Sequence, residues 1–534
     1  MSLPPTHGGS LDQTGAAKAA STILARTLSQ LEDARSRHDT ATHASPQALR
    51  AGPLYDGLSG LVLLRVESAR LNDRSVDQAQ LARDFDQLMA YTATLPDARF
   101  GFMDGYLGVA YLLARWRAIS ADTSRDADIA HLLTRVERAA DQAVNWDFVG
   151  GGAGAIHALL ACEQFANCGP ALALAQRLAV TLRRSARAQR RGLSWDTAAP
   201  SAMQNFTGFA HGPSGAASAF LALHDRAPSD WYLAAAADAF RYEDQFFSDA
   251  HQNWYNPRDL GVTRYEWDAD TTALLDALRH GVNPRLGYAE PRNAWCYGAP
   301  GMVPPRCHLA RLGFASPADD LVRRAIRAQL ALLATPGNLS LCHGDIGNAD
   351  LMLTAARIRH DTALEADVRS WATDALAHLA TNESAWHDGT PAGQGELNLM
   401  QGKAGLGYFA LRLLHAETPS LLYPAETWTT RGTHAHRPAG SVASASRYAV
   451  DAANVVDSVV ITTPHHAARA AVIPDASSRV ADDSMATRID AAFEALAATI
   501  PDLCMDLTRF RGRLTRPNFG AEVAHGIEQE GRPA

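Results

Sequence analysis

The chain has 534 residues, of which 47% are hydrophobic and 20% are charged, as expected for a globular protein with a large buried core. Its formal net charge of −8, without a run of basic residues, gives no indication of nucleic-acid binding. The N-terminus lacks the cationic start and apolar core of a secretory signal, and no apolar run reaches the ~20 residues of a membrane span. We therefore expect a cytoplasmic protein, in which the six cysteines suit metal binding or catalysis better than a disulfide framework.

Seven amphipathic stretches with helical periodicity are distributed along the chain. The clearest begins at residues 316–319 with a polar cap, a proline in the first helical position and an acidic first turn. Its apolar positions, spaced by four, four and three residues, are Val322, Ile326, Leu330 and Leu333. The other stretches begin near Leu11, Ser75, Arg125, Pro170, Ser229 and Thr362.

A Gly-x-x-Gly turn follows each amphipathic stretch and precedes a short segment that is apolar on nearly all sides. The turns occupy residues 57–60, 105–108, 151–154, 212–215, 298–301, 344–347 and 402–405. A helix that is apolar on most sides is buried, and glycine lets the backbone bend sharply and neighbouring helices approach closely. The alternation predicts an all-α fold, an α/α barrel (toroid) of seven outer and seven inner helices with the turns at one end.

The repeats stop near Pro424, where the composition changes to one dominated by Ala, Ser, Thr, Arg and His. Within this last part, helical spacing is found at Ile489, Phe493, Leu496 and Ile500. We therefore divide the chain into a barrel domain, residues 1–424, and a partly disordered extension, residues 425–534, which carries one amphipathic helix and has no assigned role.

Two of the turns carry metal-ligating side chains at matching positions. Cys342 and His343 directly precede the turn that begins at Gly344, and Cys296 lies two residues before Gly298, in the position that Cys342 has in its own repeat. Equivalent positions of a repeated fold lie at the same end of the structure, so the three side chains can converge. Two thiolates and an imidazole leave one position of a tetrahedral zinc ion open, as a catalytic zinc requires.

Further candidate residues surround this predicted site. The residues directly before the first glycine of each turn are, in chain order, Asp56, Asp104, Gly150, His211, Tyr297, His343 and Gln401. Asp147 and Arg292 stand in the loops that enter the third and fifth turns. Because all these groups lie near the N-termini of inner helices, we expect the helix dipoles to favour thiolate over thiol and to lower the cysteine pKa.

Structural interpretations compete with some of these assignments. Asp56 and Asp104 are most simply interpreted as helix N-caps. The two cysteines could be small buried hydrophobic residues, but their matched register and the adjoining histidine favour a metal site. His211 could be a core histidine, although its register favours function. Cys307 and His308 lie inside a helical segment away from the turn, so we interpret this pair as structural.

The motifs WCYG at residues 295–298, CHG at 342–344 and AHG at 210–212, together with the seven repeats, resemble the lanthionine synthetase C (LanC) cyclases. The resemblance covers roughly residues 10–424 and implies the same α/α barrel. It implies zinc as the cofactor and, as its ligands, Cys296, Cys342 and His343. It also implies four further active-site residues, Asp147, His211, Arg292 and Tyr297.

The reaction that the resemblance implies is the addition of a peptide cysteine to a dehydroalanine or dehydrobutyrine, which closes a lanthionine or methyllanthionine ring. In this reaction Arg292 would stabilise the enolate and His211 would protonate the α-carbon. Asp147 would either orient or charge a histidine or help to remove the thiol proton, and Tyr297 would hold a water molecule or the substrate.

The implied partners are a dehydrated precursor peptide and, beyond it, a separate dehydratase and a transporter. With such partners the protein would be peripheral to a membrane-associated complex. Only some fifty residues precede the first repeat, which leaves no room for a fused dehydratase and indicates a free-standing cyclase.

Two other functions remain open at this point. One is the addition of glutathione to dehydrated residues, as in the LanC-like proteins of eukaryotes, and the other is a non-catalytic scaffold that binds a peptide or a dehydratase. The presence of all seven matched residues argues against the scaffold. An α/α glycosidase would need a pair of carboxylates, whereas this rim supplies cysteine and histidine. Pro304 and Pro305 depart from the family pattern and predict that the fifth inner helix starts late or irregularly.

Overall fold

The computed structural model describes residues 13–40, 51–71, 77–142, 145–196, 205–257, 272–282, 291–314, 319–333, 337–387 and 397–429. All of them belong to one compact unit, Met1–Ser441. The cap predicted at residues 316–318 and nearly all of the predicted extension, from residue 430 onward, including its amphipathic helix, lie outside the described residues.

Within this unit, seven inner helices alternate in the chain with seven outer helices, counted over the described residues. The inner helices are α2 (Leu58–Ser68), α4 (Leu107–Ser120), α6 (Gly152–Ala166), α8 (Pro213–Arg226), α12 (Ala299–Arg311), α14 (Asp345–Arg359) and α16 (Lys403–Leu414). The outer helices are α1 (Gln13–Thr40), α3 (Gln78–Thr94), α5 (Asp126–Ala139), α7 (Pro170–Arg184), α9 (Asp230–Asp244), α13 (Asp319–Leu333) and α15 (Thr362–Thr381).

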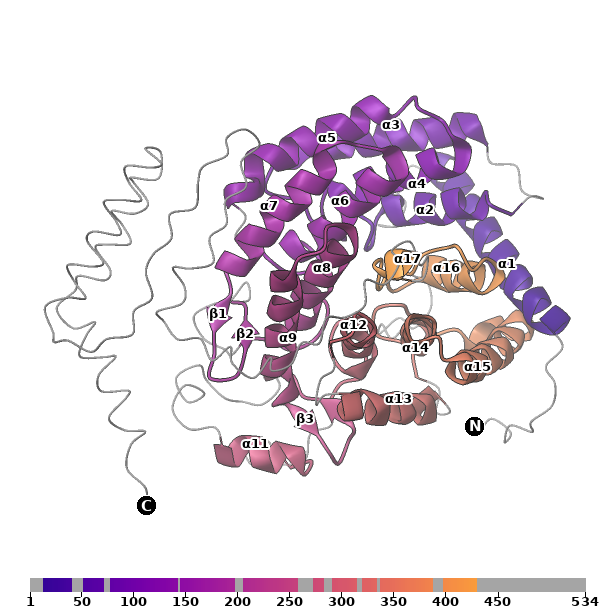
Figure 1. Ribbon diagram of the computed structural model, residues 1–534. Helices are drawn as coiled ribbons and strands as arrows, with labels where there is room; N and C mark the ends of the chain where they lie inside the picture. Colours follow the sequence, from indigo (N-terminus) through magenta and orange to yellow (C-terminus); the bar gives the residue numbers. More distant parts are fainter. Residues whose placement is uncertain are drawn as a thin grey trace, which may run out of the picture. The chain divides into compact units, whose positions relative to one another are not determined.

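The inner helices form a closed ring (Figure 1). Each contacts the next one in the order α2, α4, α6, α8, α12, α14 and α16, and α16 packs against α2 to close the ring. The inner helices are buried almost throughout, whereas the outer helices bury one stripe of side chains, such as Val322, Ala325, Ile326, Gln329 and Leu333 of α13. The predicted α/α toroid is confirmed. The segments that are apolar on all sides form the inner layer, because only there are all their faces buried.

The second glycine of every turn permits a close backbone approach. A Cβ atom on Gly154 would lie 1.9 Å from the carbonyl oxygen of Phe148, and one on Gly347 would lie 1.8 Å from that of Leu341. The same clash with the carbonyl six residues earlier recurs at Gly60, Gly108, Gly215, Gly301 and Gly405. Glycine is therefore required at this position, because any side chain would push the turn away from the start of its helix.

Backbone hydrogen bonds join the seven turns into a second ring at the end where the inner helices begin. An amide of each turn donates to a carbonyl of a neighbouring turn over 2.9–3.2 Å. The donors and acceptors are Tyr55 to Met103, Met103 to Val149, Phe148 to Ala210, Ala210 to Cys296, Trp295 to Cys342, Cys342 to Met400 and Met400 to Tyr55. The residues two positions before each first glycine are thus held at fixed places around one axis.

Short strands interrupt the repeats at two places. β1 (Arg187–Ala188) pairs antiparallel with β2 (Leu193–Ser194), with Arg187 opposite Ser194. β3 (Phe247–Ser248) pairs antiparallel with β4 (Asn253–Trp254), with Phe247 opposite Trp254, and α11 (Thr272–Arg279) packs against β3. Two 3₁₀ turns, residues Ala140–Gln142 and Glu383–Ala385, and the short helix α17 (Glu426–Thr429) complete the described elements.

The fifth inner helix, for which the sequence predicts a late or irregular start, does not start late, but its N-cap Gly298 has a φ of 106°, unlike the N-cap glycines of the other inner helices. α12 begins at Ala299, directly after Gly298, and contains Pro304 and Pro305 within it. Its start is capped from another element, because the side-chain oxygen of Asn253 in β4 accepts a hydrogen bond of 2.7 Å from the amide of Ala299. Each proline removes one backbone N–H donor from the helix, and the side chains of Pro304 and Pro305 are both buried.

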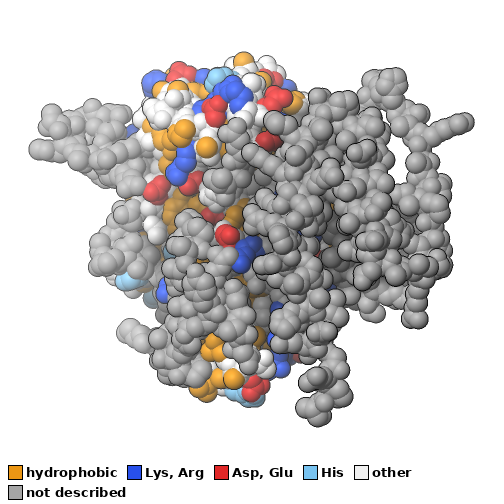
Figure 2. All heavy atoms as spheres, turned by 90° about the vertical axis from the view of Figure 1, so that its left-hand side faces the viewer, with side chains coloured by type: hydrophobic (Ala, Val, Ile, Leu, Met, Phe, Trp, Pro, Cys, Tyr) orange, Lys and Arg blue, Asp and Glu red, His pale blue; other side chains and the backbone are white. Residues whose placement is uncertain are grey.

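None of the described helices combines the length and the apolar character that a membrane span requires. On the face drawn in Figure 2, acidic and basic side chains are interspersed among the described residues. This mixture agrees with the absence of a basic run in the sequence.

Candidate metal centre and active site

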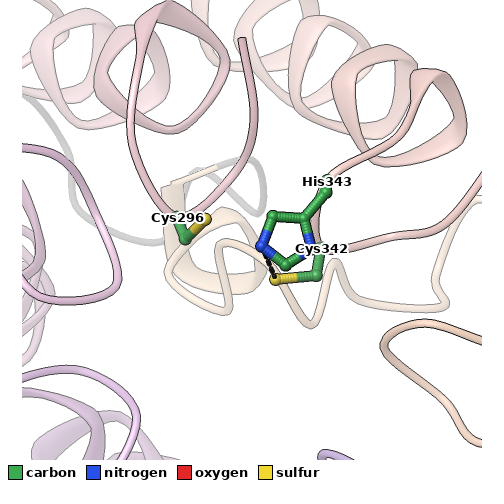
Figure 3. Close-up of side chains that lie close together, drawn as sticks. All are labelled: Cys296, Cys342 and His343. Atoms are coloured by element: carbon green, nitrogen blue, oxygen red, sulfur yellow. Dashed lines mark hydrogen bonds between the residues drawn. The ribbon is translucent and has the colours of Figure 1, made fainter. Parts of the chain in front are cut away.

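The turns before α12 and α14 bring the three predicted metal ligands together. Cys296 approaches from the first turn and Cys342 and His343 from the second, and their side chains point toward one another (Figure 3). The two sulfur atoms and a ring nitrogen of His343 all lie within 4.8 Å of one another. Both cysteines are buried and His343 is exposed, so the group has a closed side and an open side.

The geometry of this group fits a tetrahedral metal ion. An ion bonded to sulfur at about 2.3 Å and to nitrogen at about 2.0 Å would separate these two atoms by roughly 3.5 Å. The Sγ atom of Cys342 lies 3.6 Å from the Nε2 atom of His343. All three donors are soft or borderline ligands, which favour zinc over magnesium or calcium.

The two thiols of the metal-free chain differ in acidity. The hydrogen bond with Cys342 and the neighbouring His343 lower the pKa of Cys296 to about 5, against the effect of burial. Burial and the adjacent Cys296 raise the pKa of Cys342 well above its usual range. The pair therefore favours one thiolate and one thiol, and a dication would have to displace the remaining proton. The pKa of Cys296 is therefore lowered by its side-chain neighbours and not by the helix dipole expected from the sequence, and the pKa of Cys342 is raised instead of lowered.

Sequence reasoning missed a contact to the second thiol. The hydroxyl of Tyr55 donates a hydrogen bond of 3.1 Å to the Sγ atom of Cys342. Burial raises the pKa of Tyr55, so its hydroxyl stays protonated and able to donate. The signal that could have found it is the register, because Tyr55 stands two residues before Gly57, as Cys296 and Cys342 stand before their glycines.

Asp147 and His211 form a hydrogen-bonded pair. The Nδ1 atom of His211 lies 2.8 Å from the Oδ2 atom of Asp147, whose other oxygen accepts a hydrogen bond of 2.7 Å from the amide of Gly150. Because an ionised carboxylate can only accept, Nδ1 carries the proton and the opposite ring nitrogen is Nε2. The side chain of His211 is 41% exposed, whereas that of Asp147 is 16% exposed, so the acid supports a histidine that is accessible from the cavity.

Arg292 and Tyr297 form the other predicted pair. The guanidinium of Arg292 donates a hydrogen bond of 2.9 Å to the hydroxyl of Tyr297 and lies 5.2 Å from the centre of its ring. The carbonyl of Arg292 accepts a hydrogen bond of 3.1 Å from Asn253, the residue that also caps α12. The β3–β4 insertion therefore supports the loop that carries this arginine.

The candidate residues surround a cavity of about 510 Å³ at the turn end of the barrel. Five of the predicted residues line it, namely His211, Cys296, Tyr297, Cys342 and His343. Asp147 and Arg292 are not among the lining residues, and each instead contacts one that is. A further wall is formed by Pro53, Tyr55, Asp56, Tyr91, Arg99, Asp104 and Val149. Of these, sequence reasoning places only the two aspartates at this end of the barrel.

The interpretation of Asp56 and Asp104 as helix caps is wrong. The N-caps of α2 and α4 are Gly57 and Tyr106, and neither makes a side-chain capping bond. Both aspartates line the cavity instead, and the carboxylate of Asp104 lies 3.4 Å from the guanidinium of Arg99. Burial raises the pKa of Asp104 above its usual range. The cysteine–histidine pair at residues 307–308 is buried within α12, where His308 contacts Tyr423 and Asp225, as expected for a structural pair.

Comparison with known proteins identifies the family and the fold of the chain. The family model for lanthionine synthetase C-like proteins matches residues 51–424. The chain belongs to this family. Among solved structures, nisin cyclase has the same fold, with a TM-score of 0.54 and 15% sequence identity over 76% of this chain and 97% of that chain. No curated protein matches the sequence.

Proposed function

We propose that this LanC-like protein is a zinc-dependent lanthipeptide cyclase. It would add a cysteine thiol of a dehydrated peptide to a dehydroalanine or dehydrobutyrine of the same peptide and form a thioether ring. The observation that carries the proposal is the convergence of Cys296, Cys342 and His343 within 4.8 Å in the wall of a 510 Å³ cavity. Membership of the family supports the class of reaction.

The donor set suits activation of a thiol. When bound by Cys296, Cys342 and His343, a zinc ion would lower the pKa of a substrate thiol at its fourth position. The two cysteines form the buried side of the group, and the exposed His343 forms the side from which a peptide can approach. The cavity beside them accommodates a few residues of a peptide and not a folded protein.

His211 is suited to deliver the proton that completes the addition. The carboxylate of Asp147 fixes the ring through Nδ1, so Nε2 would first take up a proton and then deliver it to the α-carbon. In the overall reaction the thiol loses a proton and the α-carbon gains one, while a carbon–sulfur bond replaces the carbon–carbon double bond. The product therefore has the mass of the substrate.

Arg292 supplies positive charge for the enolate that forms before this proton arrives. Its hydrogen bond to Tyr297 ties the guanidinium to a residue that lines the cavity. A preorganised cation at the developing negative charge stabilises the transition state more than the ground state. We further propose that the protein acts in the cytoplasm on a precursor peptide that a separate dehydratase has modified and that a transporter exports.

The test of this function counts free thiols, because cyclisation does not change mass. The zinc-loaded protein is incubated with a dehydrated, cysteine-containing precursor, and the remaining thiols are alkylated and counted by mass spectrometry. We expect thiols to disappear with the native protein and to persist with C296A and C342A, which should also lose bound zinc. Full zinc stoichiometry in C342A would contradict the proposed ligand set.

Added glutathione distinguishes the second candidate reaction. A glutathione adduct increases the mass of the peptide, whereas a ring does not. Persistence of the thiols of a cognate precursor without an adduct would instead support a scaffold that binds the peptide.

A further inference from the structure

Tyr55 occupies the repeat position of the two cysteine ligands. It precedes Gly57 by two residues, as Cys296 precedes Gly298 and Cys342 precedes Gly344. Its backbone is held from both sides in the ring of turns, because its amide donates to Met103 over 3.0 Å and its carbonyl accepts from Met400 over 3.1 Å. The repeat thus directs the side chain of Tyr55 toward the same axis as the proposed metal ligands.

The side chain uses this placement to contact one of the two sulfur atoms. Its hydroxyl lies 3.1 Å from the Sγ atom of Cys342, within the distance of a hydrogen bond to sulfur. Tyr55 and Cys342 are separated by 287 positions in the sequence and by one intervening repeat, the seventh, in the ring. A thiolate bound to a metal has no proton to give, so in the loaded protein the tyrosine must be the donor.

We propose that Tyr55 is a positioning residue that holds the Cys342 sulfur as a metal ligand and reduces its reactivity relative to the substrate thiol. The proposal rests on the proposed function, because it assigns Tyr55 a task at that metal site. It extends the site to a residue of the first repeat, whereas the proposed ligands belong to the fifth and sixth repeats.

The need for such a residue follows from the donor set. With a substrate thiol at the fourth position, three sulfur atoms would share one ion, and each has lone pairs that could attack the dehydrated residue. A hydrogen bond withdraws electron density from the sulfur that accepts it, and contacts of this kind orient and tune metal ligands. The buried surroundings of Cys342 strengthen that hydrogen bond. The substrate sulfur, which Tyr55 does not contact, is then the more reactive one.

Cobalt(II) substitution provides a direct readout of this hydrogen bond. The metal-free protein is loaded with cobalt(II), and the absorption band that arises from charge transfer from thiolate to cobalt is recorded for the native protein, Y55F and Y91F. Loss of the hydrogen bond raises the energy of the sulfur lone pairs, so we expect the band of Y55F to move to longer wavelength. Y91F removes a hydroxyl from the same cavity wall and should leave the band in place.

Two further measurements accompany the spectra. Zinc affinity, measured by competition with a chelator, should fall by about 10-fold or more in Y55F and remain unchanged in Y91F. In the zinc-loaded proteins, iodoacetamide should alkylate Cys342 faster in Y55F than in native protein, with formation of a carbon–sulfur bond and release of iodide. The melting temperature of each metal-free variant reports whether loss of the hydroxyl has damaged the barrel.

The outcomes separate this inference from the proposed function. A charge-transfer band that is present in the native protein and unmoved in Y55F would overturn the role of Tyr55 and leave the metal site standing. A native protein that binds cobalt without any such band would refute both. A changed melting temperature with an unmoved band would assign Tyr55 a role in packing alone.

Discussion

At the scale of single residues, the pairing of Asp147 with His211 separates proton transfer from metal binding. The two groups lie on the third and fourth turns, whereas the proposed ligands lie on the fifth and sixth. An accessible histidine supported by a less exposed carboxylate is an arrangement that occurs at sites of acid–base chemistry. Because His211 is not one of the three converging donors, we expect the two functions to be separable by mutation.

We expect H211A to retain one zinc ion per chain and to lose cyclisation activity by about 100-fold or more, because only the proton donor is removed. Metal analysis and the rate of thiol loss measure the two properties on the same sample. D147N, which keeps the size of the side chain, should reduce the rate while leaving the metal bound. Loss of zinc from H211A would instead identify His211 as a ligand.

At the scale of the elements, buried contacts to the inner helices continue just past Pro424, where the sequence places the end of the barrel domain. Glu426 in α17 is buried, and its carboxylate pairs with Arg412 of α16 and, over 3.1 Å, with Arg357 of α14. Arg412 also pairs with Asp350, and its side chain is almost entirely buried. Because removal of one member of a buried ion pair leaves a charge uncompensated, the few residues after Pro424 contribute to the barrel.

Two truncated chains test this contribution. A chain that ends at Thr429 should have a free energy of unfolding close to that of a chain that ends at residue 441. A chain that ends at Pro424 should be less stable by on the order of 3 kcal/mol, because Arg412 and Arg357 lose a buried partner. Denaturant unfolding monitored by circular dichroism measures the difference, and E426A in the longer chain serves as the matched variant. Equal free energies of unfolding for all these proteins would show that the ion pairs of Glu426 make no net contribution to stability.

At the scale of the whole molecule, the ring is closed by contacts outside the proposed metal site. The contact between α16 and α2 and the hydrogen bond from Met400 to Tyr55 complete the circle through apolar packing and backbone groups. The proposed ligands lie in two adjacent turns of the seven. A metal ion would therefore add local stability without creating the fold.

Removal of zinc by a chelator should leave the helical circular dichroism spectrum unchanged while it lowers the melting temperature. The stabilisation by bound metal depends on the ratio of the free metal concentration to the dissociation constant, and each factor of ten in this ratio contributes about 1.4 kcal/mol. Titration of zinc into the metal-free protein, followed by thermal melting, should raise the melting temperature progressively. A metal-free chain that loses its helical signal would show that the site belongs to the folding core.

The sequence alone determined the architecture and the proposed ligands because both are encoded by local, repeated signals. The Gly-x-x-Gly turns mark the start of each inner helix, and the shared register of Cys296 and Cys342 predicts that they converge. The tertiary structure alone decided the contact of Tyr55 with Cys342, the turning of Asp56 and Asp104 toward the cavity and the capping of α12 by Asn253. Each of these features depends on which side chains of different repeats come within contact distance, and the packing of helices far apart in the chain sets those distances. A local sequence pattern specifies where a helix begins, whereas the residues that contact its first turn are determined only when the ring of helices has closed.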